Sequence, residues 1–223
     1  MNTELFIKAV TKFFAGLLII AALLFLPAWT IRYPQGWTLL GILFIPMFGA
    51  GLIMMSKNPD LLRKRLNAKE KEKQQKTVIL LSGIMFLAAF ILAGLSFRFG
   101  WLMLPFPVSI IAAVVFLLAY ALYGEVLREN TYLSRTIEVQ ENQKVIDTGL
   151  YGVVRHPMYM ATLILFLAMP LVLGSLISLF IMFCYIPIIV KRIRNEEQVL
   201  EKELPGYTEY KKKVRYRLIP FIW

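Results

Sequence analysis

The chain has 223 residues, of which 58% are hydrophobic, and it carries a formal net charge of +11. Several apolar runs reach about 20 residues, the length that an α-helix needs to cross the hydrocarbon core of a bilayer. This composition excludes an ordinary soluble domain and indicates an integral membrane protein, for which we expect no nucleic-acid partner despite the positive charge.

Cysteine and histidine are both scarce, since Cys184 is the only cysteine and His156 the only histidine. A single cysteine excludes an internal disulfide and a cysteine metal cluster. A zinc or haem site would have to be built almost entirely from carboxylates, which these metals rarely use alone. We therefore expect no metal site.

Membrane spans are expected in the first part of the chain at about 10–31, 37–56, 77–97 and 104–124. The first run, from Ala9 to Ile31, is longer than the apolar core of a cleaved signal peptide, so we expect it to be retained as an anchor.

Basic residues predict the orientation of these spans. The loop from Lys57 to Lys76 is rich in lysine and arginine, including Lys69 and Lys71, whereas the short loops near Arg32 and Arg98 are not. The positive-inside rule places the basic loop, the N-terminus and everything after residue 124 in the cytoplasm. We expect the protein to lie in the inner, cytoplasmic membrane.

The basic loop also contains a helix signal. Asn58-Pro59 has the form of an N-cap followed by proline at the first helical position. Leu61, Leu62 and Leu66 would then lie on the membrane surface as one face of a short amphipathic helix.

Residues 157–190 form a further apolar stretch, which as one straight helix would be about 50 Å long and too long for a single crossing. Pro170 and Gly174 near its middle predict a turn. Basic residues flank both of its ends, so the chain is expected to enter the membrane and return as a helical hairpin.

After the hairpin, we expect a helix to continue through Leu204, to stop at Pro205-Gly206 and to restart near Thr208. The predicted fold class is therefore all-α integral membrane, with about four transmembrane helices, a C-terminal helical hairpin and a cytoplasmic helical tail. We predict a single domain over residues 1–223, made of a four-span part (1–124) and a second part (125–223).

The residues that open the hairpin, Arg155-His156-Pro157, are costly to place at a bilayer boundary. A helix N-terminus exposes unsatisfied N–H groups and attracts an anion, which Arg155 and His156 can also bind. In the alternative interpretation, Arg155 extends to lipid phosphate and His156 only caps the helix.

A second cluster, Arg192, Arg194, Asn195, Glu196 and Glu197, follows where the hairpin returns to the cytoplasm. Adjacent carboxylates point about 100° apart on a helix, so we expect only one of the two to face the bundle. An i,i+4 ion pair between Arg192 and Glu196 is the alternative role. The hairpin brings this cluster to the depth of 155–159, which suits a zwitterionic ligand of amino-acid type.

Five motifs occur in order along the second part of the chain: Asn130-x-Tyr132…Ile137…Gln140…Gly149-x-Tyr151, Arg155-His156-Pro157-x-Tyr159, Glu196-Glu197, Leu204-Pro205-Gly206-Tyr207-x-x-Tyr210 and Tyr216-Arg217-Leu218-Ile219-Pro220. Through them, the run from Asn130 to Trp223 resembles the membrane methyltransferases related to isoprenylcysteine carboxyl methyltransferase and phospholipid N-methyltransferases.

This resemblance implies an S-adenosyl-L-methionine pocket built from the hairpin and the C-terminal segment, in an active site that faces the cytoplasm. A lipophilic acceptor, either an isoprenylcysteine-like carboxylate or a lipid head group, would enter sideways from the surrounding membrane lipids. The implied cofactor-binding residues are Gln140, Gly149, Tyr151, Arg155, His156, Pro157, Tyr159, Glu196, Glu197, Tyr207 and Tyr210.

The implied catalytic residues are Arg192, Glu196 and Arg194. Either arginine would orient an acidic acceptor. The candidates to take a proton from an amine acceptor are Glu196, Glu197 and His156. Two other functions stay open: a sterol-reductase-like enzyme that uses NADPH, and a non-catalytic protein that binds or transports membrane lipids.

Overall fold

A computed structural model describes residues 3–67, 73–134 and 136–223. This part of the chain is helical, with turns and loops between helices and one isolated bridge between Met103 and Ser175. The α-helices are α1 (Thr3–Ala28), α2 (Pro34–Lys57), α3 (Pro59–Leu66), α4 (Lys73–Phe99), α5 (Phe106–Glu129), α6 (Pro157–Val172), α7 (Leu176–Met182), α8 (Tyr185–Glu203) and α9 (Tyr207–Lys213).

Within the described residues, five helical stretches are long and apolar enough to cross a membrane. Four of them are α1, α2, α4 and α5, which correspond to the expected spans. The fifth runs from Leu176 to Glu203 and comprises α7 and α8, whereas α6 is apolar but shorter. The predicted all-α membrane fold is confirmed, and the protein is an integral membrane protein.

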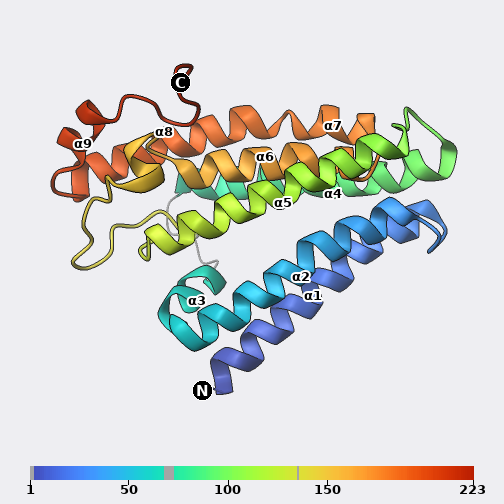
Figure 1. The fold of residues 1–223 in the computed structure, drawn as a ribbon, viewed down its shortest axis with the longest axis horizontal. Coiled ribbons are helices and arrows are strands. Elements are labelled where there is room, and N and C mark those ends of the chain that lie inside the picture. The colour runs from blue at the N-terminus through green and yellow to red at the C-terminus, as the bar shows by residue number, and fades with distance from the viewer. Residues whose placement is uncertain (1–2, 68–72, 135) are drawn as a thin grey trace.

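The two parts of the chain pack against each other. Figure 1 shows α5, α6 and α8 running alongside one another, with the pair α1 and α2 crossing beneath them at an angle. One buried apolar cluster joins residues from both parts, including Leu24, Phe90, Phe116 and Leu165. The buried hydroxyl of Tyr33 also donates a hydrogen bond to the carbonyl of Leu173, at 2.7 Å.

The hairpin turns where proline and glycine predicted it. Gly174 adopts a positive φ of 72°, which glycine tolerates best, and Ser175 caps α7 by accepting the N–H of Ser178 at 3.2 Å. The return limb continues past the apolar stretch to Glu203, which confirms the prediction of a helix that runs on to about Leu204. It does so because the polar residues after 190 still bury one face of α8, at Ile193, Asn195 and Glu197.

Two shorter helices are also confirmed. The side chain of Asn58 accepts the N–H of Leu61 at 3.1 Å and starts α3. Gly206, at φ 83°, separates α8 from α9. Residues 68–72, which include the predicted orientation signals Lys69 and Lys71, lie outside the described residues.

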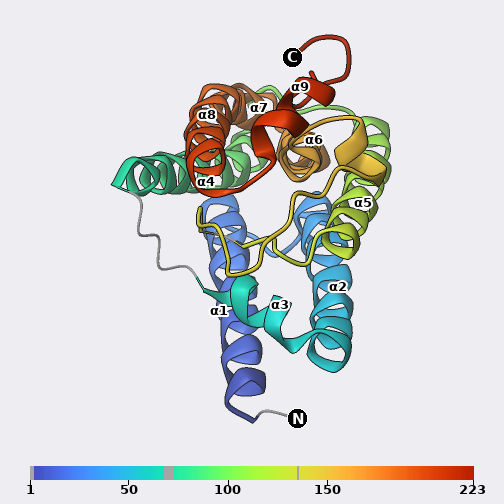
Figure 2. The ribbon, with the colours of Figure 1, turned by 90° about the vertical axis from the view of Figure 1, so that its left-hand side faces the viewer.

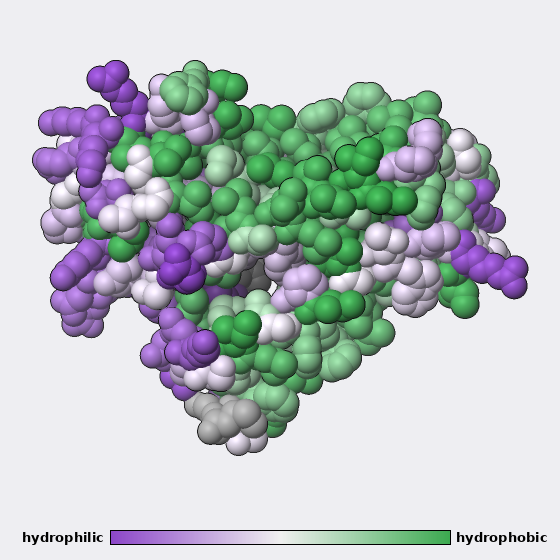
Figure 3. Space-filling view, viewed as in Figure 1, coloured by the Kyte–Doolittle hydropathy of each residue, from purple (hydrophilic) through white to green (hydrophobic). Residues whose placement is uncertain are grey.

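The surface has the hydropathy pattern of a membrane protein. In the face shown in Figure 3, hydrophobic residues cover the middle and hydrophilic ones gather at the two ends. The end that holds α9 is the more hydrophilic one (Figures 1 and 3).

The close approach of α4 to α1 at Gly94 provides a test of stability. A methyl group at Gly94 in α4 would lie 2.5 Å from the carbonyl oxygen of Leu24 in α1, whereas one at Gly83 of the same helix meets nothing within 4 Å. We expect Gly94→Ala to reduce the free energy of unfolding by about 1–3 kcal/mol through overpacking. Gly83→Ala should be neutral or stabilising, because alanine favours a helix. Thermal unfolding in detergent measures both, and equal effects would contradict the packing.

Candidate active site

The carboxylate of Glu197 lies at the centre of a buried polar cluster. The Nε of Arg155 donates to its Oε1 at 2.8 Å, and the Nε of Arg217 donates to its Oε2 at 2.8 Å. The Nε2 of His156 lies 3.2 Å from Oε1. The side chains of Arg155 and Glu197 are only 4% and 3% exposed. The expected approach of 155–159 to 192–197 is therefore confirmed.

The C-terminal segment closes this cluster from a third side. Arg155 Nη1 donates to the carbonyls of Val214 and Arg215 at 2.7 and 2.8 Å. The backbone N–H groups of Arg155 and His156 donate to the carbonyls of Tyr216 and Arg217, each at 2.9 Å. The Arg155 guanidinium thus joins α6, α8 and the C-terminal segment.

Glu196 belongs to a second, more accessible group. The hydroxyl of Tyr159 donates to its carboxylate and accepts a hydrogen bond from Arg192 Nε at 2.9 Å. The prediction that only one of the adjacent carboxylates faces the bundle is therefore wrong. Both carboxylates form hydrogen bonds because α8 has partners on two sides. The start of α6 and the C-terminal segment bind Glu197, and Tyr159 binds Glu196.

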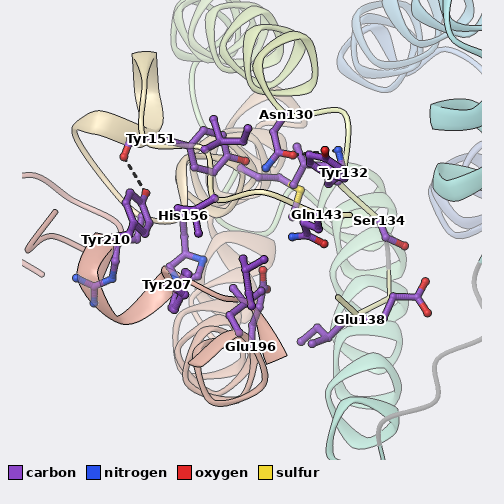
Figure 4. A pocket seen from close by; sticks show the side chains of 18 of the residues that line it. Asn130, Tyr132, Ser134, Glu138, Gln143, Tyr151, His156, Glu196, Tyr207 and Tyr210 are labelled. Carbon is purple, nitrogen blue, oxygen red and sulfur yellow. Dashed lines mark hydrogen bonds between the residues drawn. The ribbon is translucent and has the colours of Figure 1, made fainter. Parts of the chain in front are cut away.

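A polar pocket adjoins Glu196, between the start of α6, α8, α9 and the segments 130–134 and 136–146 (Figure 4). Its empty space, which includes a part open to solvent, is about 830 Å³. The predicted site residues that line it are Tyr151, Arg155, His156, Tyr159, Arg192, Glu196, Tyr207 and Tyr210.

The other predicted residues lie outside this lining. Glu197 lies in the buried cluster, and Arg194 is exposed in a separate shallow groove of α8. Gln140 donates to the carbonyl of Tyr132. Gly149 adopts φ 53° beside Glu129, and Pro157 is the first residue of α6. The structure therefore places these residues where they support the backbone or face outward.

Three buried tyrosines surround the pocket. Burial raises the pKa of the phenols of Tyr151, Tyr207 and Tyr210 well above the usual tyrosine value, so all three stay protonated. Tyr210 donates to the carbonyl of Tyr151 at 2.7 Å, drawn as the dashed line in Figure 4. The buried hydroxyl of Tyr207 has no hydrogen-bond partner within the described part of the chain.

A second cavity meets the first. This apolar groove lies between α4, α6 and α8 and contains about 1190 Å³ of empty space, including its open side. It is lined by apolar residues such as Val78, Phe86 and Ile189. The residues that line both cavities are Ser134, Thr136, Met158, Tyr159 and Arg192. The site therefore combines a polar compartment with an apolar one.

Some lining residues were not predicted as site residues. Those with polar side chains are Asn130, Tyr132, Ser134, Thr136, Glu138, Gln143 and Lys144. Asn130 and Tyr132 stand in one of the quoted motifs, as does Arg217 of the buried cluster, so motif membership was a usable signal for these three. The others lie in a segment whose described residues form neither a helix nor a strand.

The chain is similar to known membrane enzymes. Residues 108–205 match the family described as phospholipid methyltransferase, which confirms the resemblance drawn from the motifs. A curated relative is the Delta(14)-sterol reductase of Mus musculus, which is 28% identical over 134 residues. The alignment covers 54% of this chain and 32% of the relative, so the chain spans about a third of the length of the relative it matches.

Because of the buried cluster, we expect substitutions of two glutamates of α8 to differ strongly in their effect on the free energy of unfolding. Glu197→Gln leaves the guanidinium of Arg155 buried without its counter-charge, and we expect a loss of about 3–5 kcal/mol in the free energy of unfolding. Glu201→Gln removes only a surface ion pair with Lys211 and should cost less than about 1 kcal/mol. Thermal unfolding in detergent measures both; a Glu197→Gln variant as stable as the control would contradict the role of the cluster.

Proposed function

We propose that the protein transfers a methyl group from S-adenosyl-L-methionine to a lipophilic acceptor dissolved in the membrane. One observation carries the proposal: the polar pocket meets the apolar groove at Tyr159 and Arg192, in a protein whose helices are long enough to cross a bilayer. Such a pair of compartments suits one polar and one lipophilic reactant. The match of 108–205 to phospholipid methyltransferases supports the same reaction class.

The residues of the polar pocket fit the proposed cofactor. Glu196 offers a carboxylate to a cationic sulfonium or amine, and Lys144 offers a positive charge to a carboxylate. Thr136 and Gln143 add groups able to hydrogen-bond hydroxyls and ring nitrogens. The hydroxyl of Tyr207 lacks a partner among the described residues. These groups match a zwitterion attached to a nucleoside.

The bound cofactor would supply an electrophilic methyl group that an aligned nucleophile accepts. The protein's residues then contribute alignment and exclusion of water. Tyr159 holds the Glu196 carboxylate and the Arg192 side chain through one hydroxyl, at the junction of the two cavities. The Arg155–Glu197–Arg217 cluster keeps α6 and α8 at a fixed spacing.

The acceptor decides whether a base is needed. A carboxylate acceptor already carries the electron pair that attacks the methyl group. An amine acceptor loses a proton, which an oxygen of Glu196 is placed to receive. Isoprenylcysteine-like carboxylates and lipid head groups both remain candidate acceptors.

The proposed setting is the inner membrane, with the polar pocket at the cytoplasmic side. The positive-inside rule supports this orientation, since α9 and the segment after it are rich in Lys and Arg. We also propose that residues 1–223 act as a single domain, in which α4 of the first part forms one wall of the groove.

A second candidate function is a reductase that uses NADPH, because the sterol reductase of Mus musculus is a relative. Isothermal titration of the detergent-purified protein with S-adenosylmethionine and with NADPH separates the candidates. We expect S-adenosylmethionine to bind and NADPH not to bind. The reverse would favour the reductase, and binding of neither would favour a non-catalytic lipid-binding or transport protein.

A transfer assay tests the role of Glu196. Purified protein, tritiated S-adenosylmethionine and total membrane lipid are combined, and the labelled lipid is counted. We expect Glu196→Gln to lower the rate by about tenfold to a hundredfold, since the variant removes a charge and a proton acceptor from the pocket. Glu203→Gln, two turns later on α8 and exposed, should retain the rate. Equal rates in both variants would contradict the assignment.

A further inference from the structure

The short helix α3 carries basic side chains from the first part of the chain to the site. Leu61 and Leu62 are buried, which holds this helix in place. Lys64 donates to the carbonyl of Thr131 at 3.4 Å and lies 5.8 Å from the ring centre of Tyr132. Figure 2 shows α3 directly beside the irregular segment that precedes α6. A helix remote in sequence thus contacts the wall of the site.

Arg65, at the end of α3, contacts neutral groups. Its Nη1 donates to the carbonyl of Ser134 at 3.3 Å and lies 3.9 Å from the sulfur of Met158. Its Nη2 donates to the hydroxyl of Tyr123 in α5. Within the described residues, no carboxylate pairs with this half-buried guanidinium. A cation withdrawn from water without a counter-charge is costly, and an anionic ligand would offset that cost.

The charged side chains that line the apolar groove are all positive among the described residues. Among the described residues that line it, two are arginines, Arg65 and Arg192, and none is aspartate or glutamate. Arg65 contacts Met158 and Arg192 contacts Tyr159, so both guanidinium groups lie at the first turn of α6. The groove is therefore apolar along most of its lining and positively charged at the end next to the polar pocket.

We propose that Arg65 and Arg192 together bind the anionic head of a membrane amphiphile whose apolar tail occupies the groove. The tail would lie along Val78, Phe86 and Ile189, and the head would lie where the groove meets the polar pocket. Guanidinium groups suit this task because they bind carboxylate and phosphate oxygens through paired hydrogen bonds. Identifying this amphiphile as the methyl acceptor rests on the proposed function, whereas the binding itself does not.

Photolabelling in nanodiscs of phosphatidylcholine tests the site. The probes are a palmitate with a diazirine in its chain and the alcohol of the same chain. We expect the acid to label the groove peptides of α4 and α8 about tenfold more than the alcohol, as a charge-assisted hydrogen bond allows. Equal labelling by acid and alcohol in the wild type would overturn the proposal. Removal of the label by inorganic phosphate would also overturn it, since the site would then serve a soluble anion.

Matched variants assign the preference to Arg65. Arg65→Gln should reduce labelling by the acid to the level of the alcohol, and Arg65→Lys should retain most of the preference. Arg63→Gln is the control, because Arg63 is exposed on the same helix and pairs with Asp60. An undiminished preference in Arg65→Gln would contradict the role of this residue. Titration of S-adenosylmethionine into the same samples reports separately on the proposed function.

Discussion

The site depends on one buried interaction, the ion cluster around Glu197. Its carboxylate is satisfied by Arg155, Arg217 and His156, which come from the start of α6 and from the C-terminal segment. A buried charge is stable only when such partners are complete. The cluster therefore fixes not only the distance between α6 and α8 but also the rotation of α8 about its axis.

That rotation decides which neighbouring residues can take part in chemistry. With Glu197 directed inward, Glu196 and Arg192 reach the polar pocket, whereas Arg194 is exposed on another face. Tyr159 then links Glu196 and Arg192 at the boundary between the polar pocket and the apolar groove. A structural ion cluster thus positions a separate set of residues that face the ligand.

Much of the fold could be predicted because its signals are local. Apolar length predicted the spans, Pro170 and Gly174 predicted the hairpin turn, and Asn58-Pro59 predicted the start of α3. The approach of 155–159 to 192–197 followed from the hairpin alone. Pro205-Gly206 likewise predicted the end of the return limb, which lies at Glu203.

The remaining features of the site depend on long-range packing. The use of both Glu196 and Glu197 requires partners on two sides of α8, and one of them, Arg217, lies in a segment without helical periodicity. Arg65 reaches the groove from α3 and contacts Met158, which lies 93 residues later in the sequence. A motif singled out Arg217 but not its partner, and no local pattern singled out Arg65, so only the folded structure reveals the two contacts.

The most direct test is an experimental structure of the protein in a lipid nanodisc with S-adenosylhomocysteine. We expect the ligand to occupy the polar pocket against Glu196 and Tyr159, with its sulfur toward the junction with the groove and with Glu197 still bound to Arg155 and Arg217. Ligand density at another place, or a Glu197 carboxylate released from the arginines to bind the ligand, would contradict this arrangement of the site.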